Sequence, residues 1–361
     1  MKKLIIYHRE DNDGVFSGAL FYDYLINTLN ISTNDIVTLP ADYALLSHFS
    51  KNNTVEDLHE KYDTIIMTDI SFNDAEYMRK LFNEFGNNFI WCDHHKPIID
   101  ESFKSNFNDA IGVRNTQKSA ILCAYEFLYD AFNEVYSTIC KNPVENFPEF
   151  LRILSGWDSW SYEREGYDFE YVRNINKGTT MYFDLDMNKV LDVVHKIITS
   201  YHNKDDYNDG WTKENEYALI NEMYNLGKDL NNYDDKTMEN IIKTSGDCSW
   251  KIYVYDDDKE RSLYRETCVI FHQGASNSQM FKILKKINPK IKNGLIFKHT
   301  PSGEWVISLY NIYEYDWFHC GEYLKRIFGG GGHAGAAGAT LSENEFIKIL
   351  KSKAIYDAKM S

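Results

Sequence analysis

The sequence contains no long apolar run and no closely spaced pair of cysteines. No stretch approaches the roughly 20 apolar residues that a transmembrane helix needs, which argues against a membrane-spanning protein. The apolar run in the N-terminal MKKLIIYH is too short for a signal-peptide core and enters a polar loop at once, so we expect a first strand there. The six cysteines form no CxxC pair and are typical of reduced thiols. Together these absences predict a cytoplasmic protein without membrane contact.

Basic residues are also scarce, because 39 Lys and Arg oppose 54 Asp and Glu for a net charge of −15. This balance argues against a protein that coats long nucleic acid. The charge is unevenly spread. From residue 246 to the end, 16 basic residues oppose 13 acidic ones, so this part carries +3 and the first 245 residues carry −18. The distribution allows metal binding in the acidic part and anion binding in the basic part, and chance segregation of solvated charge explains it equally well.

Hydrophobic residues make up 43% of the chain, enough for a large core, and their pattern predicts an α/β protein. In the first half, apolar runs alternate with helical spacing, which indicates a parallel sheet covered by helices on both faces. The expected strands are 4–7, 36–39, 64–67 and 89–92, and the expected helices are 15–29, 75–85 and 119–132, the last capped by Ser119.

The second half predicts a helical connector and then a smaller α/β domain. Residues 185–245 are polar and helical in pattern, with Asn- and Asp-rich interruptions near 203–210 and 231–235. After residue 250 we expect strands and helices to alternate. The strands are 251–255, 267–272, 294–298 and 305–310, and the helices lie near 276–287, 319–328 and 343–355. The expected domains are therefore 1–185, a connector at 186–245, and 246–361.

Acidic and imidazole side chains gather where the predicted parallel strands end. Ligands bind at the carboxyl ends of such strands, so these side chains are candidates for one site. Taken alone, an Asp at a strand end is more often a helix cap or turn former, and a single His is more often a buried structural residue. Four segments carry the candidates: HREDNDG at 8–14, TD at 68–69, DHH at 93–95 and WD at 157–158.

Taken together, the candidates suit a pair of divalent metal ions. Carboxylates and imidazoles are ligands for Mn²⁺ and similar ions, with Mg²⁺ or Co²⁺ as alternatives. Two such ions about 3.5–4 Å apart need several protein ligands and a bridging carboxylate. Gly14 would let the backbone turn tightly between the first loop and its helix. The six candidate ligands are His8, Asp11, Asp13, Asp69, His94 and Asp158.

The ordered motifs HREDNDG, TDIS, CDHH and GGGGHAGAAG resemble those of the DHH phosphoesterases with a DHH-associated C-terminal domain. The resemblance covers nearly the whole chain, and the SGWDSW segment at 155–160 is most similar to the nanoRNase-B-type branch. It implies an N-terminal Rossmann-like DHH domain, a substrate-binding C-terminal domain and an active site in the cleft between them.

The resemblance also implies a role for each residue. His8 and Asp11 would hold one ion, and Asp13, His94 and Asp158 the other, with Asp69 shared. Asp93 would orient a ligand histidine, and His95 would donate a hydrogen bond to the phosphate. In the C-terminal domain, the substrate contacts would be Gly330, Gly331, Gly332 and His333, part of the run 329–333.

Two features depart from the family pattern. His8 and Asp11 are three positions apart, where many members have four, and Tyr310 stands where relatives often carry an arginine. Tyr310 can donate one hydrogen bond or stack on a base. Arg114 and Lys118 could replace the missing arginine as phosphate contacts, although solvated surface charge is the simpler interpretation of both.

The leading functional hypothesis is hydrolysis of short oligonucleotides to mononucleotides, in the manner of a nanoRNA exonuclease. A cyclic mono- or dinucleotide phosphodiesterase is the alternative, and a non-catalytic nucleotide sensor is a further one. The expected partners are a short oligonucleotide or cyclic nucleotide and no membrane, and the sequence is also compatible with a homodimer. The GGGGH segment argues against an inorganic pyrophosphatase, whose relatives lack it.

Overall fold

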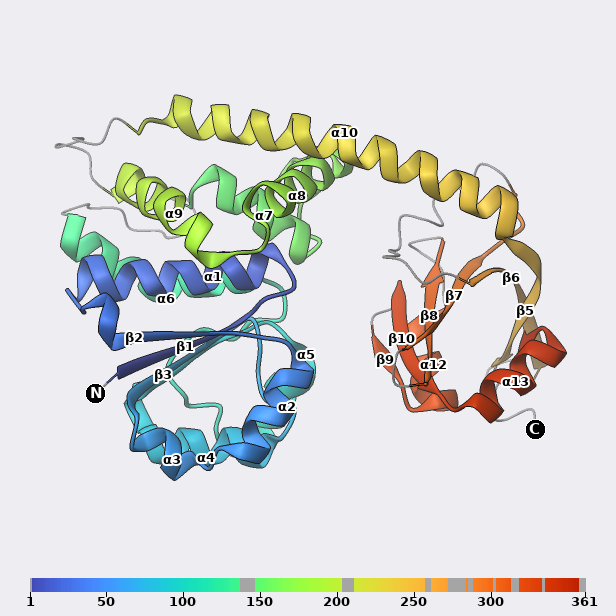
Figure 1. The fold of residues 1–361 in the computed structure, drawn as a ribbon, viewed down its shortest axis with the longest axis horizontal. Helices are drawn as coiled ribbons and strands as arrows, with labels where there is room; N and C mark the ends of the chain where they lie inside the picture. The colour runs from blue at the N-terminus through green and yellow to red at the C-terminus, as the bar shows by residue number, and fades with distance from the viewer. Residues whose placement is uncertain are drawn as a thin grey trace. The chain divides into compact units, whose positions relative to one another are not determined.

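The structure is a computed structural model that describes residues 2–136, 147–202, 211–256, 261–271, 284, 288–300, 303–312, 318–332 and 335–356. The chain divides into two compact units, Met1–Asn231 and Asn232–Ser361, which are described separately (Figure 1). One helix, α10 (Lys213–Ser245), belongs to both units.

A four-stranded parallel sheet is the centre of the first unit. Its strands lie in the order β2-β1-β3-β4 and are β1 (Lys2–His8), β2 (Ile36–Ala41), β3 (Tyr62–Thr68) and β4 (Phe89–Cys92). All four predicted strands are confirmed. Because every strand points the same way, the loops that follow them emerge at one edge of the sheet.

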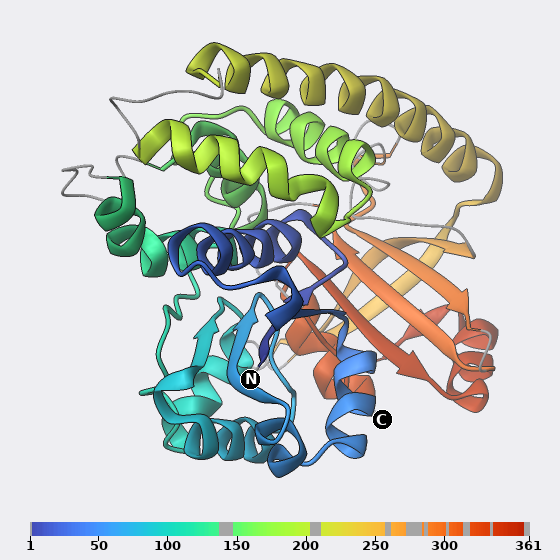
Figure 2. The same ribbon diagram turned by 60° about the vertical axis from the view of Figure 1, so that its left-hand side comes forward.

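Helices cover both faces of this sheet, because successive strand residues point to opposite sides. Ile5 belongs to one hydrophobic cluster with helices α1, α6 and α9, and Ile6 belongs to another with α2, α4 and α5 (Figures 1 and 2). The predicted helix at 15–29 appears as α1 followed by a π-helical turn at Tyr24–Thr28. The bounds are α1 (Asn12–Asp23), α2 (Tyr43–Asn52), α3 (Val55–His59), α4 (Ala75–Phe85), α5 (Lys96–Lys104), α6 (Ala120–Tyr136) and α9 (Met187–His202).

The remaining helices of the first unit are α7 (Glu149–Asp158), α8 (Phe169–Phe183) and part of α10. The predicted interruption at 231–235 is wrong, because α10 continues through it. Asn231 is buried there and donates a hydrogen bond to the side chain of Asn174, 2.8 Å away, instead of ending the helix. The predicted interruption at 203–210 lies outside the described residues.

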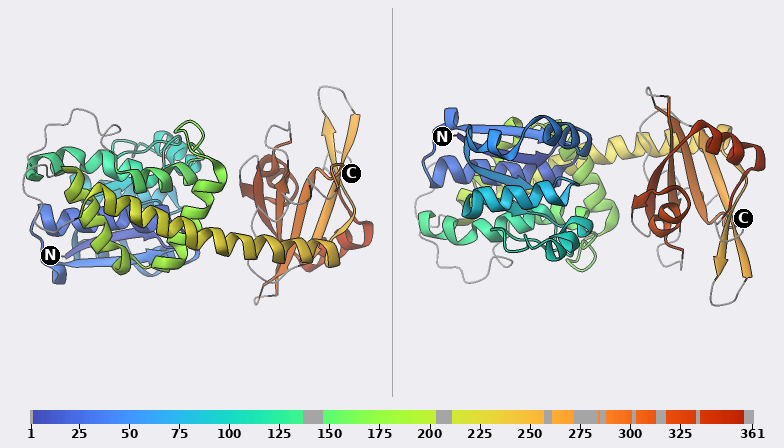
Figure 3. Two further views of the ribbon diagram at one scale, coloured as in Figure 1. Left: turned by 90° about the horizontal axis from the view of Figure 1, so that it is seen from above. Right: turned by 90° about the horizontal axis from the view of Figure 1, so that it is seen from below.

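The second unit contains a seven-stranded mixed sheet in the order β11-β5-β6-β7-β8-β10-β9 (Figure 3). Helices α12 and α13 both contribute to its larger hydrophobic cluster. The bounds are β5 (Asp247–Asp256), β6 (Arg261–Phe271), β7 (Asn293–His299), β8 (Trp305–Asn311), α12 (Cys320–Phe328), β9 (Gly331–Gly332), β10 (Ala336–Leu341), α13 (Glu343–Ser352) and β11 (Ala354–Ile355).

The four strands predicted for this unit are present, and the sheet contains three more. The strands β9 and β11 are two residues long, and the Ala- and Gly-rich β10 lacks the β-branched residues that identify a strand. The predicted helix at 343–355 ends at Ser352, and β11 follows it. The predicted helix at 276–287 lies outside the described residues except for Leu284.

The structure confirms the α/β class and the N-terminal parallel sheet. Among the helices in the described part of the chain, none is long and apolar enough to cross a membrane.

A buried histidine in α9 makes the first unit sensitive to acid. His202 is fully buried, its Nε2 lies 3.0 Å from the Tyr125 hydroxyl, and aromatic rings surround it. Burial lowers the pKa of His202 to about 4. Between that value and the unfolded pKa of about 6.5, the unfolded chain binds a proton that the folded chain does not. Stability is therefore lost as the pH falls through this window.

We predict that His202 accounts for a loss of up to about 3 kcal/mol of unfolding free energy between pH 7 and pH 4. Urea unfolding in EDTA measures this loss. His202→Gln should reduce the pH dependence, and the exposed His48→Gln should not. Identical pH profiles for the wild type and His202→Gln would contradict the assignment.

Candidate metal centre

Three neighbouring strands bring their following residues to one edge of the first sheet. Strand β1 ends at His8, β3 is followed by Asp69, and β4 is followed by 93–95. Because β1 pairs with β3 and β3 with β4, these residues meet although they are up to 87 positions apart in the sequence. The end of α7 brings Asp158 to the same cluster.

The first ligand group consists of His8, Asp11 and Asp69. Nδ1 of His8 lies 3.1 Å from Oδ2 of Asp11 and 3.5 Å from Oδ2 of Asp69. Asp11 is also the N-cap of α1, since its Oδ1 accepts a hydrogen bond from the amide of Gly14 at 2.9 Å. The alternative interpretations of Asp11, as cap and as ligand, are therefore compatible, because each uses a different carboxylate oxygen.

Gly14 is required by a close approach of the backbone. A Cβ at this position would lie 2.1 Å from the carbonyl oxygen of His8. The reason for glycine therefore differs from the expected tight turn, because Gly14 lies in the first helical turn of α1 and its φ is not positive. Any side chain here would push α1 away from the strand that carries His8.

The second ligand group consists of Asp13, His94 and Asp158. Nε2 of His94 lies 3.2 Å from Oδ2 of Asp158, 3.8 Å from Oδ2 of Asp13 and 3.2 Å from Oδ1 of Asp69. Asp13 also accepts hydrogen bonds from the amides of Ala120 and Ile121, at 2.6 and 2.9 Å. The first turn of α6 therefore orients Asp13 and balances part of its charge.

Asp69 joins the two groups, because one of its oxygens faces each of them. Oδ2 is directed to His8 and Oδ1 to His94. Its backbone is in the left-handed region, with φ of 59°, and its amide donates a hydrogen bond to the Cys92 carbonyl at 3.0 Å. Such a conformation costs about 1–2 kcal/mol for a residue other than glycine, although Asp tolerates it better than most. The strained backbone therefore belongs to the residue whose carboxylate faces both ligand groups.

The donor set fits divalent cations. Four buried atoms of the cluster have no hydrogen-bond partner among the described residues: His8 Nε2, both carboxylate oxygens of Asp69 and Asp158 Oδ2. Buried polar atoms normally have partners, and buried carboxylates need a compensating charge. Oxygen and imidazole donors in this number suit Mn²⁺ or a similar ion. The residues present therefore fit the metal that the sequence predicts.

The pKa values in the cluster reflect its crowded negative charge. Burial raises the pKa of Asp69 well above its usual range, and the charges of Asp11 and Asp13 raise it further. Burial and the charge of Asp13 likewise raise the pKa of Asp158. For His8, burial alone would lower the pKa, but the nearby carboxylates of Asp11 and Asp69 outweigh it and raise the pKa to about 11. Cations bound here would remove this repulsion.

Asp93 is fully buried and its oxygens are already occupied. Oδ1 accepts hydrogen bonds from the amides of His94 and His95, and Oδ2 accepts one from Trp91 Nε1 at 3.1 Å. Oδ1 also lies 2.8 Å from Nδ1 of His95. Asp93 therefore positions His95 rather than binding metal.

With Nδ1 engaged, Nε2 of His95 is the ring nitrogen that remains for a ligand. Burial alone lowers the pKa of His95, but the hydrogen bond and charge of Asp93 outweigh it and raise that pKa. The raised value favours a protonated donor, as expected for a phosphate contact. His95 also groups with Asp69 and His94 as a third cluster of potential ligand atoms.

Tyr43 is a site residue that the sequence analysis missed. Its ring lies against His95 in an edge-on contact of 6.2 Å between centroids, and 6.0 Å from the ring of His8. Burial first, and then the charges of Asp93 and the other carboxylates, raise its pKa, so the hydroxyl stays protonated. Tyr43 lies two positions after the parallel strand β2, so the strand-end rule could have found it.

Arg114 and Lys118 have structural partners. The Arg114 guanidinium donates hydrogen bonds to the backbone carbonyls of Trp91, Asn108 and Ala110 at 2.6–2.9 Å. Nζ of Lys118 pairs with Glu126 at 2.6 Å. Arg114 therefore links the loop after β4 to the strand, and the roles of Arg114 and Lys118 as phosphate contacts stay predictions.

The glycine run follows α12 in the second unit. Gly329 ends the helix in the left-handed conformation, with φ of 68°, and β9 then pairs with β10. A Cβ on Gly330 would lie 2.3 Å from the carbonyl oxygen of Gly338. Tyr310 lies in β8 opposite Ala336. The predicted substrate contact His333 lies outside the described residues, and the roles of Gly330, Gly331, Gly332 and Tyr310 stay predictions.

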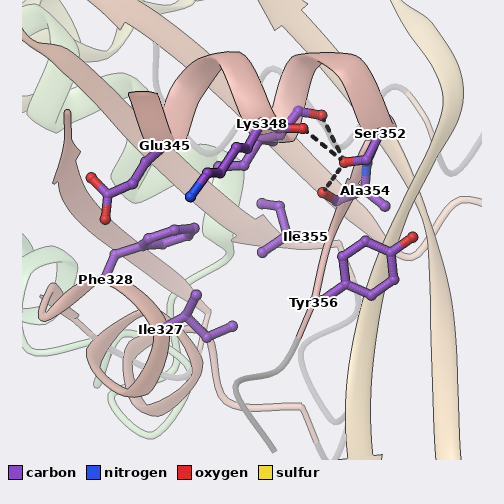
Figure 4. Close-up of a pocket in the computed structure, with 9 residues that line it drawn as sticks. Ile327, Phe328, Glu345, Lys348, Ser352, Ala354, Ile355 and Tyr356 are labelled. Carbon is purple, nitrogen blue, oxygen red and sulfur yellow. Dashed lines mark hydrogen bonds between the residues drawn. The ribbon is translucent and has the colours of Figure 1, made fainter. Parts of the chain in front are cut away.

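A cavity of about 330 Å³ lies elsewhere in the second unit, beside α12 and α13 (Figure 4). Phe328, Ile355 and Tyr356 contribute to its lining, and none of the predicted site residues does. The Ser352 hydroxyl, which also lines it, lies within hydrogen-bond distance of backbone carbonyls in α13 and of the Ala354 carbonyl in β11.

Residues 2–152 match the DHH family, N-terminal domain. The N-terminal part of the chain is therefore similar to the N-terminal domain of the DHH family, as the sequence motifs predict. The match includes every predicted metal ligand except Asp158. This match supports hydrolysis of a phosphoester as the reaction class and the use of divalent metal.

Several solved structures are similar to this chain over most of its length and share little sequence with it. An uncharacterized protein from Helicobacter pylori G27 is 14% identical over 98% of this chain and 97% of its own, with a TM-score of 0.38. The pGpG-specific phosphodiesterase PggH from Vibrio cholerae is 13% identical over 98% and 97%, with a TM-score of 0.44. Exonuclease RecJ bound to manganese is 13% identical over 98% and 88%, with a TM-score of 0.49. No curated protein matches the chain.

We predict that Asp69→Asn weakens metal binding without unfolding the protein. Asn fits the left-handed backbone but offers only one carbonyl oxygen, so it cannot join two ions. Titration calorimetry with Mn²⁺ should show loss of one of two ions, or a fall of at least about 10- to 100-fold in its affinity. The metal-free melting temperature should stay equal or rise, because a repelling charge is gone. Asp63→Asn, on the strand that precedes Asp69, is the control. Equal Mn²⁺ binding by Asp69→Asn and wild type would refute the bridging role.

Proposed function

We propose that this protein is a metal-dependent phosphodiesterase that removes mononucleotides from short oligonucleotides. The observation that carries the proposal is Asp69, whose two buried oxygens face two separate ligand groups. A shared carboxylate between two such groups is the arrangement that two-metal phosphoryl hydrolysis uses. The match of residues 2–152 to the N-terminal domain of the DHH family supports the same reaction class.

Several groups of this chain would act on the substrate. Two cations held there would polarise a phosphoryl oxygen and lower the pKa of a water molecule. His95, positioned by Asp93, would donate a hydrogen bond from Nε2 to a phosphoryl oxygen. Tyr43, whose hydroxyl remains protonated, is a second donor beside it. Both donors would stabilise negative charge as it develops.

The charge distribution supports a short substrate. The first 245 residues carry −18, so long nucleic acid would meet repulsion beyond the immediate surroundings of the metal ions. A substrate of a few nucleotides places its scissile phosphate on the metal centre and little charge elsewhere.

We propose the cytoplasm as the location of this activity. We also propose a homodimer, which light scattering would test.

We predict that di- to pentanucleotides are cleaved faster than a 24-mer at the same salt concentration in Mn²⁺. Product mass after incubation with each substrate measures this preference. Cyclic dinucleotide and pyrophosphate belong in the same panel, because preferential cleavage of the cyclic compound would favour the alternative function. EDTA should abolish all cleavage, and full activity after exhaustive chelation would rule out the metal mechanism.

His333 tests whether the second unit takes part in the reaction. If His333 contacts the substrate phosphate, His333→Ala should lower turnover by on the order of 10²-fold and leave Mn²⁺ content at the wild-type level. Metal content, melting temperature and kcat should be measured on the same sample. A lowered melting temperature with normal kcat would mean that His333 only packs the turn after Phe328.

A further inference from the structure

Trp160 is an exposed aromatic residue directly beside the metal centre. It follows the ligand Asp158 by two positions, so their Cα atoms are at most about 7.6 Å apart. Its side chain is 61% exposed, although burying an indole is strongly favourable. A large apolar surface left open next to a catalytic group suggests a ligand.

The backbone at Trp160 is also strained. Its φ is 55°, in the left-handed region, which a bulky residue rarely adopts. The position is the one after the C-cap of α7, where glycine is the usual residue. The neighbouring amides of Ser159 and Ser161 both donate to carbonyls of the last turn of α7, each at 3.0 Å, and these bonds hold the conformation. A tryptophan at a glycine position therefore points to a use for its side chain.

The indole lies beside two aromatic rings and remains largely exposed. Trp157 stacks against it, with 6.2 Å between ring centroids and 22° between planes, and Trp157 is itself packed on Phe169. Tyr162 contacts the Trp160 ring at an angle of 51°. This packing fixes the orientation of the ring and leaves aromatic surface in solvent.

We propose that Trp160 is a stacking platform for a nucleobase of the substrate. The inference rests on the proposed function, because it assigns the base of a nucleotide whose phosphate lies on the ligands around Asp158. An aromatic face binds any base by stacking, without hydrogen bonds that read its identity. The platform therefore supplies affinity for nucleotides in an acidic unit whose described site offers few cationic contacts to a phosphate chain.

The decisive experiment compares dinucleotides with abasic analogues in which either the first or the second base is removed. For the wild type, removing the base on the Trp160 side should lower kcat/KM by about 10- to 100-fold. Trp160→Gly should show the same loss on the natural dinucleotide and no further loss on that abasic substrate. Trp160→Phe should recover most of the activity.

Stability measurements separate stacking from a structural role. Glycine relieves the left-handed strain and forfeits the contact with Trp157, so the melting temperature of Trp160→Gly should stay within a few degrees of wild type. Phe103→Ala, which removes another exposed aromatic of the same unit, should leave both kcat/KM and base dependence unchanged. Equal loss on natural and abasic substrates would overturn the platform and indicate a contact with protein instead.

The test distinguishes this inference from the proposed function. If the wild type cleaves no nucleotide substrate, the proposed function is overturned. Titration calorimetry with a nucleoside monophosphate in Mn²⁺ then decides the stacking by itself. Weaker binding to Trp160→Gly supports the platform, and equal affinities overturn it.

Discussion

Repulsion between buried carboxylates is the constraint around which the first unit is built. Asp11, Asp13, Asp69 and Asp158 converge with three histidines at one edge of the sheet. Bringing these charges together costs free energy that the apolar core on both faces of the sheet has to offset. Divalent cations reverse this cost, so the same arrangement that opposes folding of the metal-free chain becomes the source of metal affinity.

The surrounding structure holds each ligand by a second contact. Asp11 caps α1, Asp13 accepts two amides at the start of α6, and Asp93 holds His95. The contacts of Asp11 and Asp13 come from the backbone of helices that are themselves packed on the sheet, and that of Asp93 comes from the His95 ring, so these side chains are positioned before metal arrives. Such preorganisation reduces the reorganisation that binding and catalysis require.

Two left-handed residues lie at this centre, Asp69 and Trp160. In each, the conformation costs free energy, and hydrogen bonds of neighbouring backbone groups maintain it. A more stable protein would place glycine at position 160. Functional sites commonly keep a residue that lowers stability when the function needs its side chain.

The alternation of apolar runs with helices was sufficient to predict the parallel sheet. The motifs at the strand ends then predicted that six candidate ligands cluster, because parallel strands bring their carboxyl ends to one edge. Strand β4 and helix α4 were predicted at their observed bounds, since the spacing of their apolar residues is regular. Local patterns were insufficient for β10, whose alanines and glycines carry no strand signal, and for α10, where Asn231 is buried by tertiary packing.

Only the tertiary structure decided which oxygen of Asp69 faces which ligand group. The same holds for the hydrogen bonds of Arg114 to backbone carbonyls, and for the positions of Tyr43 and Trp160 beside the site. These features depend on how helices pack on the sheet, and that packing brings together side chains that no spacing along the chain relates.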